Sequence, residues 1–392
     1  MGLYARRRAA FYLFDGNMEQ VEIDYDTYLQ AEPYGADRET KHRELTDVLK
    51  ELTKRHFAEC PEYAAILKAQ GFDGPEAIDA IKSYEDIPFL PVRLFKEYDL
   101  RSVPREDVVK TMTSSGTTGQ SVSKIYLDRE TSANQQKVMT RIVSDFIGKK
   151  RLSMIILDTK AILKDRNAFS ARGAGILGFS MFGRDRIYAL DEDMNLDLDG
   201  LNAFLEKHKG ENIFLFGFTF MIWQHFYRRM LELAPEDRPD LSRGVLIHGG
   251  GWKKLAAEAV SPAAFKDALH DVCGIRQTRI YDYYGMVEQT GTIYMECECG
   301  HLHTPRWSDI IIRNPENWSV QAPGDVGIVE VVSALPKSYP GHVLLTEDEG
   351  VIEGEDDCPC GRKGKYFRIL GRIKNAEIRG CSDTYADKFS RK

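Results

Sequence analysis

The sequence predicts an α/β protein in which helices cover a sheet, and three patterns support that class. Short apolar runs typical of buried strands occur at residues 153–158, 186–190, 213–218, 244–248 and 278–281. Helical segments lie between several of these runs, at residues 201–207, 223–233 and 262–272. After Gly324 the chain turns more purely to strands, at residues 326–332 and 342–346, which predicts a smaller β region. Apolar strands that alternate with helices indicate a sheet buried on both faces.

The first 105 residues have a different pattern, because helical periodicity dominates there. Residues 37–57 place leucine and valine at helical spacing with charges between them. Residues 61–69 predict a second helix that begins with a proline, a residue favoured in the first helical turn. Pro88 and Pro91 then enforce an extended chain. We expect residues 1–105 to form a helical lead-in that packs on the region after it.

The overall composition is that of an ordinary globular protein, since 43% of the 392 residues are hydrophobic and 29% are charged. A net charge of −7 argues against a nucleic-acid partner. No apolar run reaches the roughly 18 residues of a membrane span, and the run after Arg8 is too short for a signal peptide. We therefore expect a cytoplasmic protein. Seven cysteines, an odd number, favour metal binding, catalysis or burial over a disulfide framework.

Residues 111–124 form a segment rich in hydroxyl side chains and glycine. Its candidate phosphate-binding residues are Ser114, Ser115, Gly116, Thr117, Thr118, Gly119 and Lys124. Serine, threonine and glycine at this density exclude a helix interior and predict a loop. Glycine lets backbone N–H groups approach an anion, hydroxyls donate hydrogen bonds and lysine supplies charge, which together suit a polyphosphate. The spacing is not that of a Walker A loop, and a surface loop without a ligand is the alternative interpretation.

Two further segments follow directly on predicted strands. The first is a run of three glycines, namely Gly249, Gly250 and Gly251. Glycines at the carboxyl end of a strand let the backbone approach a flat ring or a phosphate, although a tight strand-to-helix turn explains them too. The second segment contains Asp282, Tyr284, Gly285 and Glu288. It combines an aromatic ring that can stack on adenine with a carboxylate that suits Mg²⁺.

These segments resemble the signatures of the adenylate-forming superfamily, which includes acyl-CoA synthetases, peptide-synthetase adenylation domains and luciferases. The S-S-G-T-T-G loop with its lysine resembles the phosphate-binding signature, and Y-G-x-x-E resembles the motif that binds adenine and magnesium. The resemblance implies that Tyr284 stacks on adenine and that Glu288 binds Mg²⁺, while Val287 replaces the usual threonine. It also implies that Asp348, within T-E-D, holds the ribose hydroxyls and that Arg372, within L-G-R, contacts the nucleotide at a hinge.

Further segments resemble a narrower family, the LuxE-like acyl-protein synthetases of bacterial bioluminescence. They are the loop at 114–124, the strand at 215–221, the run at 356–364 and the tail at 379–384. In that family the acid is adenylated and then transferred to a cysteine near the C-terminus, so the resemblance implies that Cys381 carries the acyl group. It also implies an acyl reductase as partner.

The end of the chain departs from the wider superfamily. Only 20 residues, 373–392, follow Arg372, whereas typical members continue into a mobile domain of about a hundred residues that brings a catalytic lysine. Cys381 lies nine positions after Arg372, so an extended tether lets its thiol sweep roughly 30 Å. We expect this tail to replace the mobile domain and Cys381 to be reactive, with an inert cysteine as the alternative.

The acid pocket and a general base are less well defined by the sequence. Residues 213–223 are too apolar for a surface element, and they make Phe218 and Phe220 candidates for lining an acyl pocket. Core packing explains that run equally well. His248 lies beside the glycine run and could accept a proton from the thiol, but a structural histidine is the favoured interpretation.

Two C-x-C pairs predict a metal site. The candidate ligands are Cys297, Cys299, Cys358 and Cys360. Four soft thiolates suit tetrahedral zinc, although C-x-x-C is the commoner spacing. Phenylacetate-CoA-ligase-like relatives have comparable cysteines. His301 and His303 are alternative ligands, and four free thiols without metal are the other interpretation.

The sequence as a whole predicts an ATP- and Mg²⁺-dependent acyl-protein synthetase with the α/β adenylate-forming fold of layered sheets and helices. Lys124, Glu288 and Cys381 are its candidate catalytic residues, and a fatty or similar carboxylic acid is its expected substrate. We divide the chain into a lead-in at 1–105, an adenylate-forming core at 106–372 and a tail at 373–392. A carboxylate–CoA ligase of the phenylacetate type and a non-catalytic subunit that binds nucleotide and zinc are the rival interpretations. The identity of the acid and the oligomeric state are left open.

Overall fold

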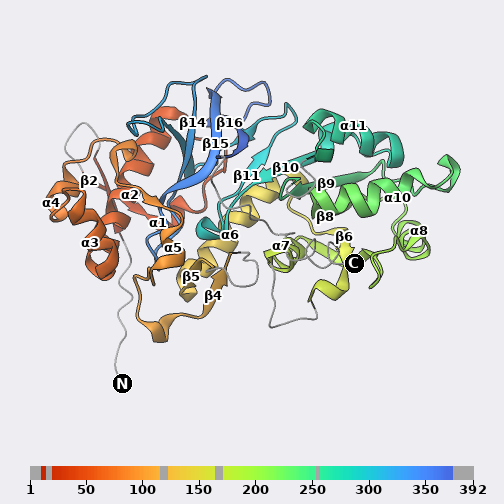
Figure 1. Ribbon diagram of the computed structural model, residues 1–392, viewed down its shortest axis with the longest axis horizontal. Coiled ribbons are helices and arrows are strands. Elements are labelled where there is room, and N and C mark those ends of the chain that lie inside the picture. The colour runs from red at the N-terminus through yellow and green to blue at the C-terminus, as the bar shows by residue number, and fades with distance from the viewer. Residues whose placement is uncertain (1–9, 15–19, 115–121, 164–170, 253–256, 374–392) are drawn as a thin grey trace.

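The computed structural model describes residues 10–14, 20–114, 122–163, 171–252 and 257–373. The N-terminal helices and the strands β14 to β16 lie at one end of the molecule (Figure 1). The strands β6, β8 and β9 lie at the other end with helices α8, α10 and α11, and β10 and β11 run between the two halves. The α/β class predicted from the sequence is confirmed.

The N-terminal part contains the predicted helices. Helix α2 (Arg38–Glu59) begins where the Asp37 carboxylate accepts a hydrogen bond from the backbone N–H of Thr40. Helix α3 (Pro61–Ala69) has its proline at the first position. The shorter elements are β1 (Ala10–Phe14), β2 (Gln20–Asp24), α1 (Tyr25–Tyr28), α4 (Pro75–Asp79), β3 (Leu90–Pro91) and α5 (Leu94–Glu97). The hairpin β1–β2 has no counterpart among the sequence predictions.

The middle of the chain forms the parallel part of the sheet. Its strands are β6 (Leu152–Thr159), β7 (Gly183–Leu190), β8 (Ile213–Phe218), β9 (Gly244–Gly249) and β10 (Ile280–Tyr284). Its helices are α6 (Arg129–Ile147), α7 (Ala171–Ser180), α8 (Leu198–Lys207), α9 (Thr219–Met221), α10 (Arg228–Leu231) and α11 (Pro262–Cys273). A strand is present at each of the five predicted apolar runs. Every residue of β8 and β9 is buried, as their apolar sequences indicated. The helix expected at 223–233 begins instead with a π-helical turn, Ile222–Tyr227.

The predicted β region does not form a separate sheet. Its strands are β11 (Tyr294–Glu296), β12 (Leu302–His303), β13 (Ser308–Arg313), β14 (Val326–Ser333), β15 (Val343–Glu355) and β16 (Lys365–Arg372). In the described part of the chain they join the parallel strands in one hydrogen-bonded path, in the order β13-β14-β15-β16-β12-β11-β10-β9-β8-β6-β7. The antiparallel pairing of β11 with β10 makes this connection. A separate hairpin, β4 (Lys110–Thr113) with β5 (Lys124–Leu127), flanks the hydroxyl-rich loop.

Helix α2 packs against residues of the sheet region. Leu45, Val48 and Leu49 of α2 are fully buried in the same hydrophobic cluster as Trp307 and Val343. Strand β3 also adds to the sheet by pairing in parallel with β15. Among the described residues no helix is long and apolar enough to cross a membrane.

Candidate functional site

Three predicted nucleotide-binding residues from distant parts of the chain meet at one edge of the sheet. Tyr284 ends β10, Asp348 lies within β15 and Arg372 ends β16. The Tyr284 hydroxyl donates a hydrogen bond to Oδ2 of Asp348 over 2.7 Å, and Nε of Arg372 lies 3.6 Å from Oδ1. Asp348 faces Arg372 because the antiparallel register of β15 and β16 makes them partners. The fold therefore builds one polar group from three sequence motifs.

The charges within this group depend on one another. Burial raises the pKa of Asp348, while the hydrogen bond from Tyr284 and the charge of Arg372 oppose that rise. Burial and the neighbouring carboxylate raise the pKa of Tyr284 well above its usual value. The phenol consequently stays protonated and is a donor at physiological pH.

Glu288, the predicted magnesium ligand, lies in a short 3₁₀ turn after β10, Val287–Gln289. It is buried, and burial raises its pKa. A hydrogen bond with Ser123 and the charges of Lys96 and Arg372 oppose that rise. An oxygen donor in this position fits Mg²⁺, which prefers oxygen ligands.

The hydroxyl-rich loop is described at its two flanks. The N–H of Ser114 donates to the backbone carbonyl of Ser123, and the N–H of Ser123 donates to Oγ of Ser114 over 2.9 Å. Lys124 is exposed at the start of β5. The other predicted loop residues lie outside the described residues, as does the predicted acyl carrier: Ser115, Gly116, Thr117, Thr118, Gly119 and Cys381.

A polar pocket of about 250 Å³ lies beside Lys124. Lys96 and Arg105 bring two more cations to its lining, together with Glu97 and Asp99. The sequence analysis assigned no function to this segment, because residues before 106 were assigned to a structural lead-in. Isolated cations of this kind carry no motif, so only the fold could place them beside Lys124.

The glycine run at the end of β9 meets aromatic rings of the protein itself. A Cβ on Gly249 would lie 2.7 Å from the ring of Tyr283, and one on Gly250 would lie 2.8 Å from the ring of Phe218. Gly250 and Gly251 also have φ angles of +86° and +59°, a conformation that favours glycine. The φ angles fit the tight turn considered from the sequence, while the predicted approach of a ligand to these glycines stays a prediction.

The two candidate acyl-pocket residues are buried beside this turn. Phe218 is 4% exposed and Phe220 is 7% exposed, both within the main hydrophobic cluster. A Cβ on Gly175 of α7 would also meet the Phe218 ring, at 2.8 Å, so the ring fills the space between α7 and the glycine turn. Close to it a buried ion pair joins Arg172 to Asp158 over 3.1 Å, and the sequence analysis did not find this pair.

His248 and Asp282 lie next to each other on β9 and β10. Nδ1 of His248 lies 2.9 Å from the hydroxyl of Thr219, and burial lowers the histidine pKa to about 3. A histidine held neutral in this way fits the structural interpretation favoured from the sequence. The side chain of Asp282 is half-exposed. Partial removal from water and the nearby negative charge of Glu296 raise its pKa. Its backbone N–H donates to Oε2 of Glu296 over 3.0 Å.

Comparison with known proteins bears on this geometry. The sequence profile of the family described as "Acyl-protein synthetase, LuxE" matches residues 12–390. The chain belongs to this family. It is 23% identical over 316 residues to the long-chain-fatty-acid–luciferin-component ligase of Aliivibrio fischeri, covering 79% of this chain and 80% of that protein. The protein of the same name from Vibrio harveyi is 23% identical over 322 residues, covering 80% of this chain and 81% of that protein.

Solved structures show the fold of this LuxE-family chain. An open conformation of 2-hydroxyisobutyryl-CoA ligase, in complex with 2-HIB-AMP and CoA, matches with a TM-score of 0.63 at 16% identity. The match covers 87% of this chain and 77% of that chain. The same ligase in its thioesterification state matches with a TM-score of 0.61. The fold is therefore that of the adenylate-forming ligases, as the sequence resemblance implied.

The cysteine cluster of this LuxE-family chain differs from the predicted set of four cysteines. The ligand atoms of Cys297, His303, Cys358 and Cys360 all lie within 4.8 Å of one another. Cys299 is exposed and is not part of this group. His301, the other predicted alternative, pairs instead with Glu353 over 2.8 Å. His303 thus takes the place expected for Cys299.

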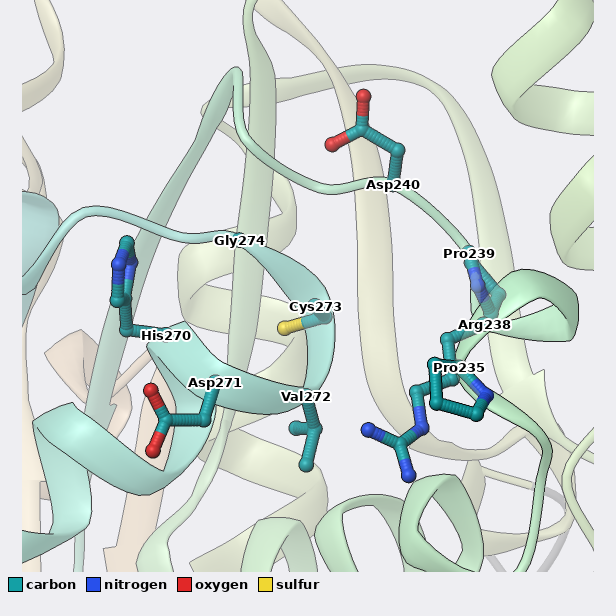
Figure 2. A pocket seen from close by; sticks show the side chains of 9 residues that line it. All are labelled: Pro235, Arg238, Pro239, Asp240, His270, Asp271, Val272, Cys273 and Gly274. Atoms are coloured by element: carbon teal, nitrogen blue, oxygen red, sulfur yellow. The ribbon is translucent and has the colours of Figure 1, made fainter.

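Figure 2 shows a second surface pocket, of about 390 Å³, whose lining includes none of the predicted site residues. Its lining combines Pro235 and Arg238 from one loop with His270, Asp271 and Cys273 from the end of α11. It lies at the amino end of β9, whereas the glycine turn lies at the carboxyl end. Ligands of open α/β sheets bind beyond the carboxyl ends of the strands, so this pocket is not part of the candidate site.

Proposed function

We propose that this chain is an AMP-forming acid–thiol ligase that activates a fatty acid with ATP and transfers the acyl group to a thiol. Membership of the acyl-protein synthetase family supports the reaction class. The two relatives named long-chain-fatty-acid–luciferin-component ligase support a long apolar acid. An acyl reductase that receives the acyl group is the corresponding proposal for the partner.

The observation that carries the proposal is the joining of Tyr284, Asp348 and Arg372, with buried Glu288 in the turn that follows Tyr284. This arrangement offers an aromatic ring, a carboxylate for paired hydroxyls, a cation and a second carboxylate. A nucleoside triphosphate presents complementary groups in its base, ribose and phosphates. A purely structural polar cluster would not need these four groups together.

In the first step an oxygen of the acid attacks the α-phosphorus of ATP, and the bond from that phosphorus to the bridging oxygen breaks. Pyrophosphate leaves, and Lys124 with the cations of the adjacent pocket offsets its charge. Glu288 would hold Mg²⁺, which supplies further charge neutralisation when bound. Tyr284, Asp348 and Arg372 hold the nucleoside in place.

In the second step a thiolate attacks the acyl carbonyl and the bond to the AMP oxygen breaks, leaving AMP and a thioester. We propose Cys381 as the acceptor, a role that rests on the resemblance of the tail to the family. His248 is not assigned as the base, because a buried imidazole with a pKa of about 3 binds a proton poorly at neutral pH.

Intact-protein mass spectrometry tests the proposal. The full chain is incubated with ATP, Mg²⁺ and a panel of carboxylic acids, and half of each sample is treated with hydroxylamine. A hydroxylamine-labile gain of one acyl group, absent from the Cys381→Ala variant, is the expected result, and it names the preferred acid. Acid-dependent pyrophosphate release that rises with coenzyme A, without an adduct, would support a CoA ligase instead. No acid-dependent pyrophosphate release would leave only the non-catalytic interpretation.

A further inference from the structure

We propose that Cys297, His303, Cys358 and Cys360 bind one zinc ion. This ion fixes the turn that joins β15 to β16 (residues 356–364), which we call the closed end of the β15–β16 hairpin. This inference does not depend on the proposed reaction. The four side chains come from two places in the chain, because Cys297 and His303 bracket the turn between β11 and β12, while Cys358 and Cys360 lie in the turn between β15 and β16. A shared ion would join these two turns.

The distances within the group match a tetrahedral site. Zn–S bonds of about 2.3 Å and Zn–N bonds of about 2.0 Å place two sulfurs about 3.8 Å apart, and a sulfur and a nitrogen about 3.6 Å apart. Sγ of Cys297 lies 3.9 Å from Sγ of Cys358, and Sγ of Cys360 lies 3.4 Å from Nε2 of His303. The sulfurs of Cys297 and Cys358 are too far apart for a disulfide, whose S–S bond is about 2.05 Å.

The two turns are built alike. The N–H of Gly300 donates to the carbonyl of Cys297 over 2.9 Å, and the N–H of Gly361 donates to the carbonyl of Cys358 over 2.9 Å. The two glycines have φ angles of +84° and +81°. Each turn thus brings a cysteine sulfur towards the same point, and the glycine makes the reversal without strain.

Backbone amides face two of the sulfurs. The backbone N–H of Cys299 points to Sγ of Cys297 over 3.4 Å, and that of Arg362 points to Sγ of Cys360 over 3.5 Å. Amide donors stabilise a negatively charged sulfur, which is the form that binds zinc. Three thiolates with Zn²⁺ and a neutral histidine carry one net negative charge, and the guanidinium of Arg362 lies beside them to offset it.

Burial makes the absence of a ligand costly. Cys297 and His303 are fully buried and Cys358 is 4% exposed. The His303 ring packs against Tyr34 and Tyr366, and its Nε2 faces Sγ of Cys360. Buried polar groups are normally satisfied, and a metal would satisfy the sulfurs and Nε2 together. Soft sulfur and imidazole ligands in this number favour zinc over magnesium or calcium.

The experiment measures metal content of the full chain purified under reducing conditions, together with four variants. We expect about one zinc per chain in the wild type and in Cys299→Ser, because Cys299 is exposed and lies outside the group. Cys297→Ser, Cys360→Ser and His303→Ala should each lose most of the zinc, at least about tenfold at a fixed chelator concentration. Removing zinc from the wild type should lower its thermal midpoint by several degrees.

A second measurement covers variants that fail to fold. Chelator-stripped wild type is titrated with Co²⁺, and intense absorption from sulfur–cobalt charge transfer with tetrahedral d–d bands at one equivalent is expected. No zinc in the purified protein and no uptake of Co²⁺ would overturn the site. Retention of zinc in His303→Ala with loss in Cys299→Ser would overturn this ligand set in favour of four cysteines.

Discussion

The two ends of the β15–β16 hairpin contrast in exposure and in the groups they hold. We call the other end, where Asp348 of β15 pairs with Arg372 of β16, the open end of the hairpin. The Arg372 side chain is 41% exposed there, and the hydroxyl of Tyr284 donates a hydrogen bond to the Asp348 carboxylate. At the closed end, Cys358 and His303 are buried and belong to a compact group of soft ligands. One end can meet a solute, while the other is occupied by the protein's own contacts.

This contrast suggests that the open end of the hairpin binds the nucleotide and that the closed end stabilises the hairpin. The open end needs a fixed geometry, because a displacement of about 1 Å at a nucleotide site can cost about a hundredfold in rate. The closed end supplies that geometry by tying the hairpin to the β11–β12 turn and, through Arg362, to Asp145 of α6. Changes at the open end should therefore affect activity with little loss of stability, and changes at the closed end should do the reverse.

Replacing Asp348 by alanine should show this division most clearly. The substitution leaves the Tyr284 hydroxyl and Arg372 without their shared carboxylate. We expect acid-dependent ATP–pyrophosphate exchange to fall about 100-fold, equivalent to about 3 kcal/mol, because a hydrogen bond and an ionic contact are lost at the nucleotide site.

The matched control is Asp348→Asn, which keeps an acceptor for Tyr284 but removes the charge. It should lose less activity than the alanine variant, and both should melt within a few degrees of the wild type. Unchanged exchange activity in Asp348→Ala would show that the open end is not the nucleotide site.

Acid tests a third position, His342, which lies just before β15 and outside both groups. Nε2 of His342 lies 2.8 Å from the hydroxyl of Thr53, and burial lowers the histidine pKa to about 3. An unfolded histidine has a pKa of about 6.5, so below that pH the unfolded state binds a proton that the folded state does not. The contribution to stability is full above pH 6.5 and falls as the pH drops towards 3, by about 2 kcal/mol at pH 5.

Chemical denaturation at pH 8 and pH 5 measures this effect in the wild type and in His342→Asn, whose amide does not titrate. The free energy of unfolding should depend less on pH in the variant. The neighbouring His56 ring, with its centroid 4.8 Å away, also has a lowered pKa and should keep part of the dependence in the variant. Equal pH dependence in both proteins would exclude His342 as a source of acid sensitivity.

Two arginines at opposite ends of the hairpin test whether one end affects stability and the other affects ATP binding. Arg362 pairs with Asp145 over 3.0 Å and with Glu298 over 2.8 Å, and its guanidinium lies 4.2 Å from the ring centroid of Phe146. Arg362→Ala should lower the free energy of unfolding by about 1–2 kcal/mol through these partly buried contacts, with the KM for ATP unchanged. Arg372→Ala should raise that KM and leave stability nearly unchanged. The opposite assignment of the two effects would reverse the roles of the two ends.

The sequence predicted the elements whose signals are local. Asp37 caps α2, a proline opens α3 and the fully apolar run at 213–218 is β8, all close to the expected bounds. The motif residues Tyr284 and Asp348 could also be named from the sequence. Their direct hydrogen bond could not, because it depends on how β10 and β15 are placed within one sheet.

The closed end shows why the sequence named His303 only as an alternative ligand. In the sequence, Cys299 pairs with Cys297 at the same spacing as Cys360 with Cys358, so both pairs suggested ligands. In the fold, the chain reverses at Gly300 and returns along β12, which buries His303 and leaves Cys299 exposed. Burial, rather than spacing, selects the group.

The smallest expected effect is that of Tyr284→Phe, which removes one hydroxyl and keeps the ring. The phenol donates to Oδ2 of Asp348, and the ring remains available to stack on a base. Loss of one hydrogen bond to a carboxylate should weaken the site by about 1 kcal/mol, or about fivefold in kcat/KM for ATP in the pyrophosphate-exchange assay. Tyr284→Ala removes the ring as well and should cost clearly more if the ring stacks on adenine. Equal losses in both variants would mean that Tyr284 contributes only through its hydroxyl, which orients Asp348. The open end would then bind the ribose without stacking on the base.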